Sequence, residues 1–290
     1  MIPSIIVMTL TTGGIYALLA SGMTLIFGVA HIVNLAHTAF YVVAAYFMWF
    51  FMSQLGLNPI ASIAITLPAV TILGLLSYQF LINRVRQHAQ AVLLITIALA
   101  MVFQEITLAL FGSHLHTSPA LIAGTTTIWG VIIPNQRLLL LGVVAVVIVA
   151  LWLFLSKAKL GTAIRATAND PEVASLMGIS VPRTLLITMG IGTFLAAVAA
   201  VLMASVWVFF PFAWMAPLTM ILAIVVLGGL GSIKGSIIGA FIIALVETLV
   251  VFLLPEQGYM QMALALLAMV IVLAVRPGGL FGIMFEEERL

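Results

Sequence analysis

Cysteine is absent from this sequence of 290 residues, and charged residues make up only 6% of it. Without cysteine the chain can form no disulfide bond and no thiolate metal site. An ordinary soluble domain carries about 25% charged residues, so this chain has too little polar surface to cover a water-soluble globule. The net charge of +2 gives no indication of a nucleic-acid-binding protein.

Several motifs of known chemistry are also missing. The sequence contains no G-x-x-x-x-G-K-[ST] phosphate-binding loop, so if ATP drives this protein it must bind to another chain. The histidines are too scattered to predict a metal site, and no nucleophile–base pair or carboxylate pair occurs at a workable spacing. We therefore expect that the chain is not an enzyme and binds no cofactor. The N-terminus lacks the basic region and cleavage site of a signal peptide, and we interpret it as a retained first span.

Long apolar runs make up most of what is present, and 64% of the residues are hydrophobic. A run of about 18 or more apolar residues with few charges predicts a membrane-spanning helix. The stretch 217–229 is short for a span and could be tilted, broken or half of a re-entrant pair, so we expect eight or nine spans. We predict an all-α, polytopic transmembrane helix bundle that forms a single domain over residues 1–290. The candidate spans are 4–28, 36–54, 59–82, 91–111, 138–156, 184–207, 217–229, 237–254 and 259–275.

The positive charges predict how the bundle is oriented, because short cytoplasmic loops are enriched in Lys and Arg. With nine spans and the N-terminus outside, Arg137 is the one basic residue left on the outer side, and the reverse orientation would invert this bias. We therefore predict an outer N-terminus and a cytoplasmic C-terminus, with the acidic tail 286–288 inside. The basic residues predicted to lie inside are Arg84, Arg86, Lys157, Lys159, Arg165, Arg183, Lys234, Arg276 and Arg289.

The most polar part of the chain is the predicted cytoplasmic loop 157–183, which contains the signals of a short helix. Asp170 is a good N-cap, Pro171 suits the first helical position, and Glu172 places negative charge at the positive end of the helix dipole. Gly178 can end the helix in a left-handed conformation. A helix of about two turns is too short to be stable alone. It must pack either on its own membrane domain or, through Ala174, Leu176, Met177 and Ile179, on a cytosolic partner protein.

Four blocks of sequence together resemble the LivH type of permease, from the ATP-driven importers of branched-chain and other hydrophobic amino acids. EVASLMG at 172–178 is similar to the E-A-A-x-x-x-G segment through which importer permeases contact their ATPases, with Val173 in place of the first alanine. Thr38 stands where the family usually has glycine after the N-x-A-H run. The other blocks are GIYALLASGMTLIFG at 14–28 followed by NLAH at 34–37, GTAIRATANDPE at 161–172, and VLGGLGSIKG at 226–235.

The resemblance implies a function and a set of partners. The chain would be the permease subunit of an ATP-binding-cassette importer in the bacterial inner membrane, taking up branched-chain amino acids or related small organic solutes. Its partners would be a second permease subunit of related but different sequence, two ATPase subunits that bind the ATP, and an extracytoplasmic solute-binding protein. The ATPases would contact the loop through Arg165, Asp170, Pro171, Glu172, Ala174, Leu176, Met177 and Gly178.

Four polar residues are candidates for the translocation path. Glu105 and Glu247 lie within predicted spans, where ionisable side chains are costly and are functional candidates by default. Each could contact a substrate ammonium group or make a buried hydrogen bond that fixes two helices. Asn34 and His37 lie in the turn between the first two spans, which either reaches the path near the inner side or is a plain solvated loop.

Gly231, Gly235 and Gly239 are spaced four residues apart. On a helix they would share one face and allow another backbone to approach closely. That face could pack within this chain, or it could form a subunit interface or a gate.

Two other functions compete with the importer subunit. A stand-alone secondary transporter or channel would need paired polar groups within broken helices. A membrane-embedded enzyme would need a His/Asp/Glu constellation at one membrane face, which the sequence does not contain.

Overall fold

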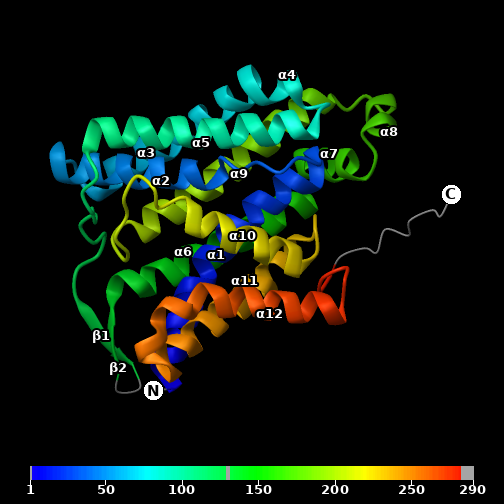
Figure 1. Ribbon diagram of the computed structural model, residues 1–290. Coiled ribbons are helices and arrows are strands. Elements are labelled where there is room, and N and C mark those ends of the chain that lie inside the picture. Colours follow the sequence, from blue (N-terminus) through cyan, green and yellow to red (C-terminus); the bar gives the residue numbers. More distant parts are fainter. Residues whose placement is uncertain (1, 129–130, 282–290) are drawn as a thin grey trace.

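The computed structural model describes residues 2–128 and 131–281 as a bundle of helices with one small β-hairpin (Figure 1). The π-helical turns Phe50–Gln54 and Tyr78–Ile82 continue α2 and α3, and the 3-10 turn Pro255–Met260 precedes α12. The helices are α1 (Ile2–Ala30), α2 (His37–Trp49), α3 (Pro59–Ser77), α4 (Asn83–Val85), α5 (Ala89–Phe111), α6 (Asn135–Lys157), α7 (Lys159–Asn169), α8 (Pro171–Leu176), α9 (Val181–Met203), α10 (Met215–Gly228), α11 (Ile233–Leu253) and α12 (Gln261–Val275). The strands are β1 (Thr125–Ile128) and β2 (Val131–Pro134), paired antiparallel.

The predicted all-α, polytopic membrane bundle is confirmed. Within the described residues, seven helical segments are long and apolar enough to cross a membrane. The short candidate span 217–229 is α10, which has 14 residues. The candidate span 36–54 corresponds to α2 and its π-helical continuation. The acidic tail 286–288 and Arg289 lie outside the described residues.

Burial separates central from peripheral helices. In α9, 78% of the most apolar window is buried inside the chain, whereas the value for the last span is 6%. The long helix α1 packs mainly against α9 and α11. Large apolar side chains of α3, α5, α6 and α12 are exposed instead, as expected for surfaces that lipid or another subunit covers. The centre of the bundle is therefore formed by α1, α2, α9, α10 and α11.

The two ends of the bundle differ (Figure 1). The N-terminus and the β1–β2 hairpin lie at one end, here called the hairpin end. The short helices α4, α7 and α8 lie at the opposite end, here called the α8 end. Because α10 is short, the hairpin-end part of its path is taken by the non-helical segment 204–214.

Glycines allow backbones to meet at the α8 end, but not all on one helix as the spacing had predicted. Gly235 and Gly239 are in α11, whereas Gly231 precedes the helix in a turn, with φ of +84°. A Cβ atom on Gly228 or Gly235 would collide with the backbone of the other residue. Gly231 instead approaches Gly28, where a Cβ would lie 3.2 Å from the Gly231 Cα. These close contacts join α1, α10 and α11 of this chain.

Candidate functional site

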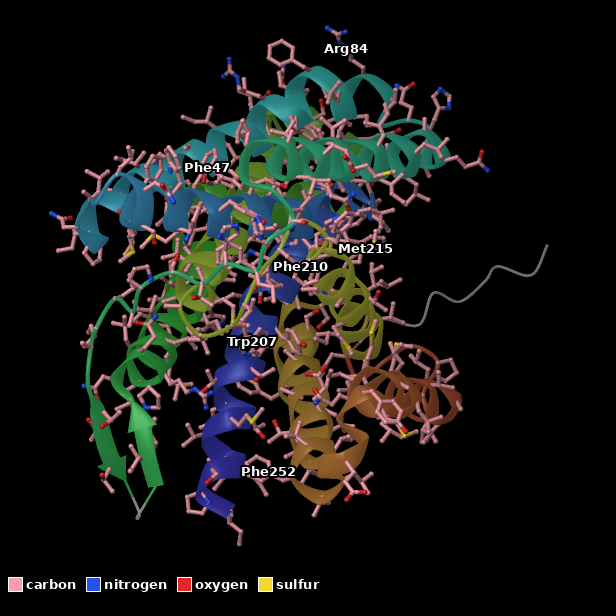
Figure 2. All side chains as sticks on the ribbon, turned by 60° about the vertical axis from the view of Figure 1, so that its left-hand side comes forward. Phe47, Arg84, Trp207, Phe210, Met215 and Phe252 are labelled. Carbon is pink, nitrogen blue, oxygen red and sulfur yellow. The ribbon has the colours of Figure 1, made fainter. Side chains whose placement is uncertain are left out.

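A cavity of about 480 Å³ lies in the half of the bundle nearer the hairpin end. Its wall combines aromatic and methionine side chains with one carboxyl group, that of Glu247, which is the sole charged lining residue in the described part of the chain. Figure 2 shows Trp207 and Phe210 on the segment that follows α9, with Met215 at the start of α10. The wall includes Tyr16, Tyr41, Met203, Trp207, Phe209, Phe210, Met215, Met220, Glu247 and Gln261.

Glu247 projects from α11 and meets α1. The Tyr16 hydroxyl donates a hydrogen bond of 3.3 Å to Glu247 Oε1. Tyr16 is 7% exposed, and Glu247 is partly buried. Both side chains line the cavity. The hydrogen bond between two helices that we considered for Glu247 is therefore present, and the same carboxyl group also borders an open space.

The segment 204–214 is held in place by the chain that follows α5. His116 and Phe209 exchange two backbone hydrogen bonds of 2.9 Å, and the Ser118 N–H donates to the Ala204 carbonyl at 2.8 Å. The His116 ring lies 4.1 Å from the Trp49 ring, centroid to centroid. This part of the cavity wall is a fixed structure, although it is not helical.

At the α8 end, the short helix predicted in the loop 157–183 is confirmed. Asp170 Oδ1 accepts hydrogen bonds from the N–H groups of Glu172 at 2.8 Å and Val173 at 3.0 Å. Pro171 is the first residue of α8. Gly178 has φ of +83°, the left-handed conformation that favours glycine. The cap and the turn both match the local sequence signals.

The structure shows which side of α8 packs on its own domain and which side is exposed. Ala174 is 3% exposed, so it faces its own domain and is not available to a partner, contrary to our expectation. Leu176 and Met177 are 86% and 78% exposed. A helix stabilised by one small buried side chain thus presents two large apolar side chains to its surroundings. Arg165, on the exposed face of the neighbouring α7, places a positive charge nearby.

Asn34 and His37 are buried, so the turn between α1 and α2 is not a solvated loop. Asn34 Oδ1 accepts a hydrogen bond of 3.1 Å from the Ala36 N–H. His37 Nε2 lies 3.1 Å from the Leu19 carbonyl oxygen. The first contact lies within the turn and the second fixes the turn against α1, and neither side chain lines the cavity described above.

Glu105 does not line the cavity that Glu247 borders, and it lies on the exposed face of α5. Its neighbour Gln104 is 7% exposed and donates to Glu105 Oε1 at 3.0 Å. The Trp214 indole N–H donates to Gln104 Oε1 at 2.8 Å. The structure therefore does not bring the four predicted path residues together into one site.

Comparison with known proteins decides the family. The family described as "Branched-chain amino acid transport system / permease component" matches residues 5–273. The chain belongs to this family. The predicted resemblance and the predicted role of a permease component are thereby confirmed.

Curated relatives align with the permease over nearly its whole length. It is 30% identical to BraD, a high-affinity branched-chain amino acid transport system permease protein of Pseudomonas aeruginosa, with 94% of this chain and 93% of the relative covered. It is also 30% identical to LivH of Escherichia coli, over 94% of this chain and 92% of the relative. A probable branched-chain amino acid transport permease protein of Methanocaldococcus jannaschii is 26% identical over 93% of this chain and 89% of the relative.

The fold has a counterpart among solved structures. PsaBC from Streptococcus pneumoniae, in complex with Fab, superposes with a TM-score of 0.54 and 16% sequence identity, covering 96% of this chain and 97% of the other. At this identity the match concerns the fold alone.

The side chains that contact the candidate residues of the permease could not be predicted from the sequence. Tyr16 lies in a block that carries the family resemblance, yet nothing in that block indicates that it contacts Glu247. The two residues are 231 positions apart. Trp207, Phe209 and Phe210 form a run of aromatic residues just after an apolar span, and this local signal could have marked the wall of a cavity.

Proposed function

We propose that this permease is the membrane subunit of an ATP-binding-cassette importer for branched-chain or related hydrophobic amino acids. The relatives' names support the solute class. The observation that carries the coupling to ATPases is the exposed apolar pair Leu176 and Met177 on α8. A short helix presenting apolar side chains at one end of a membrane bundle suits docking into a groove of a cytosolic partner.

In this function the bundle crosses the bacterial inner membrane nine times, with the N-terminus outside. The crossings are the seven long helices together with α2 and α10. The orientation is supported by the basic residues of α4, α7 and the α7–α9 region, because these elements share the α8 end (Figure 1). Arg137 follows the hairpin at the opposite end.

The residues of the coupling segment have different tasks. Asp170, Pro171 and Gly178 shape α8, and Ala174 anchors it to its own domain. Leu176 and Met177 then enter the ATPase groove. Glu172 and Arg165 are exposed charges beside that contact, and they would select a partner surface of complementary charge. Because the capped helix α8 contacts the ATPase on one side and its own domain on the other, a movement of the ATPase on nucleotide binding is passed to the bundle.

The candidate path residues also divide into separate tasks. Glu247 borders the solute path, while Asn34 and His37 fix the turn that joins α1 to α2. Glu105 is an exposed carboxyl group on a spanning helix, and such groups face protein or water in a membrane. We therefore assign the exposed face of α5 around Glu105 to contact with the second permease subunit. The remaining partners are two ATPase subunits and an extracytoplasmic solute-binding protein, and ATP binds to the ATPases.

Co-purification tests the coupling. Leu176→Asp should abolish recovery of the ATPase subunits with the tagged permease, because a carboxylate cannot enter an apolar groove. Leu55→Asp makes the same substitution at an exposed leucine of the hairpin end and should leave recovery unchanged. Full recovery with Leu176→Asp would contradict the assignment of α8. Uptake of radioactive leucine by vesicles containing the whole complex tests the solute class directly.

A further inference from the structure

Helices α10 and α11 form an antiparallel helix pair, whose two helices are in contact at one end and separated by the cavity at the other. A turn of four residues joins them at the α8 end, where Gly228 and Gly235 bring the two backbones into contact. Towards the hairpin end both helices line the cavity, α10 through Met215 and Met220 and α11 through Glu247. The cavity therefore lies between the ends of α10 and α11 that are far from the glycine contact.

The start of α10 and the carboxyl group of Glu247 lie at a similar distance from this glycine contact. Glu247 follows Gly235 by about 18 Å along α11, and Met215 precedes Gly228 by about 20 Å along α10, at a rise of 1.5 Å per residue. Both groups border the same cavity. A carboxyl group and the N-terminal end of a helix, which carries a partial positive charge, thus border one space from neighbouring helices.

The first turn of α10 carries backbone N–H groups that the helix itself cannot satisfy, because the first four have no acceptor within a helix. The N–H of Leu218 bonds to the Trp214 carbonyl at 3.1 Å, and Pro217 has no N–H to offer. The N–H of Met215 reaches the Phe212 carbonyl outside the helix at 3.4 Å, and the N–H of Ala216, the next residue, has no intrahelical acceptor. Ala216 itself lines the cavity.

Irregular backbone forms part of the cavity wall. The segment 204–214 runs where α10 would extend if it crossed the whole apolar layer. In a membrane, such backbone is found only where protein buries it or where it lines a water-filled space. Phe209 and Trp214 are 5% and 3% exposed, so the segment is packed into the protein, and its residues Trp207, Phe209 and Phe210 line the cavity.

The remaining wall is apolar and aromatic. Met203 and Met220 are adaptable apolar side chains, and Tyr41 and Trp207 offer ring faces that attract cations. Among the described lining residues there is no Lys or Arg to neutralise Glu247. A volume of about 480 Å³ falls within the usual range of small-molecule sites, roughly 300–1,000 Å³.

We propose that this cavity is a solute-binding site within the single permease subunit, for a zwitterion with an apolar body. The ammonium group of a hydrophobic amino acid binds Glu247 beside the Tyr16 hydroxyl, and its carboxylate faces the first turn of α10 at Ala216. The apolar side chain packs on Met203 and Met220. This inference rests on the proposed function and deepens it, because it assigns solute recognition to residues of this chain.

Three probes of one branched carbon skeleton test the site on the complete, nucleotide-free complex without the solute-binding protein. L-Leucine carries both charges, isopentylamine carries the ammonium group alone, and 4-methylpentanoate carries the carboxylate alone. Affinity is measured from thermal stabilisation of the complex at increasing probe concentration. Wild type should bind leucine and isopentylamine, and Glu247→Gln should weaken both at least tenfold. Binding of 4-methylpentanoate should not weaken.

Two control variants separate recognition from folding. Glu256→Gln removes the same charge from an exposed position outside the cavity and should bind all probes as wild type does. Tyr16→Phe removes the hydrogen bond to Glu247 and keeps the carboxyl group, so it should weaken isopentylamine binding clearly less than Glu247→Gln does. Equal loss of affinity in Tyr16→Phe and Glu247→Gln would mean that Glu247 only fixes α1 to α11, and it would overturn the proposal.

Uptake by vesicles distinguishes this failure from a failure of the proposed function. If Glu247→Gln imports leucine with unchanged KM, the site is wrong and the proposed function stands. If wild type imports no hydrophobic amino acid but still binds isopentylamine through Glu247, the site stands for an organic cation and the proposed function is wrong. Absence of both leucine and amine binding in wild type would also overturn the site.

Discussion

Gln104 is the buried polar side chain that connects α5 to the segment before α10. It accepts the Trp214 indole N–H at 2.8 Å and donates to Glu105 at 3.0 Å. Gln104→Leu should lower the free energy of unfolding by about 1–3 kcal/mol, because the indole N–H then stays buried without a partner. Thermal unfolding of the purified permease, followed by near-ultraviolet circular dichroism, measures the change.

The double variant Gln104→Leu/Trp214→Phe provides the control. Replacing both partners by apolar groups removes the unpaired donor, so the double variant should be more stable than Gln104→Leu alone. If Gln104→Leu unfolds like wild type, the hydrogen bond contributes nothing measurable, and the position of Trp214 must depend on packing.

Contacts between residues close together in the sequence were predictable, whereas contacts between distant residues were not. The Asp170 cap was predicted correctly because the N–H groups that donate to Asp170 lie only two and three residues further along the chain. The contact between Tyr16 and Glu247 depends on how α1 packs on α11, which no local pattern specifies. The burial of Asn34 and His37 likewise depends on packing against α1 and α9, because a polar turn alone is equally consistent with solvent.

The helix pair α10–α11 depends on glycine at their contact. A Cβ atom on Gly235 would overlap the Gly228 carbonyl group, and backbone atoms cannot turn aside as a side chain can. Gly235→Ala should therefore destabilise the permease by about 1–3 kcal/mol, the usual effect of overpacking. Thermal unfolding in detergent measures this.

Gly142 in α6 is the matched control for Gly235, since a Cβ there has no atom within 4 Å. Gly142→Ala should leave stability unchanged or raise it by up to about 1 kcal/mol through helix propensity. Equal effects at the two positions would mean that the α10–α11 contact tolerates a side chain. The spacing of three glycines predicted close packing but not that α11 begins only at Ile233, so Gly231 was wrongly placed on the helix.

The short helix α8 depends on its N-cap. Asp170→Ala removes the acceptor of two backbone N–H groups and should destabilise α8 by about 1 kcal/mol, or about fivefold in local opening. Hydrogen exchange of the Glu172 and Val173 amides, read by mass spectrometry, should then be faster. Asp170→Asn retains a good capping side chain and should exchange like wild type. Unchanged exchange in Asp170→Ala would show that packing of Ala174 alone holds the helix.

At the scale of the whole molecule, the arrangement of apolar helices joined by more polar segments could be predicted from the sequence. Apolar runs predict spans because lipid requires about 20 such residues in a row. The fold around α10 was less predictable, because the helix has only 14 residues and the segment before it is held by backbone hydrogen bonds to the distant residues His116 and Ser118. The division of helices into central and peripheral ones also depends on tertiary packing, since α9 and α12 are similarly apolar by sequence.

The orientation of the whole bundle is open to a direct test, because the chain contains no cysteine. A single cysteine can therefore be introduced at Ser175 in the exposed face of α8, or at Thr126 in the hairpin. A membrane-impermeant maleimide added to intact cells, with access to the inner membrane, should label Thr126→Cys and leave Ser175→Cys unlabelled. In inverted vesicles Ser175→Cys should react and Thr126→Cys should not, and after solubilisation both should react. Because α8 must meet ATPases in the cytoplasm, labelling of Ser175→Cys from outside would contradict both the orientation and the coupling role.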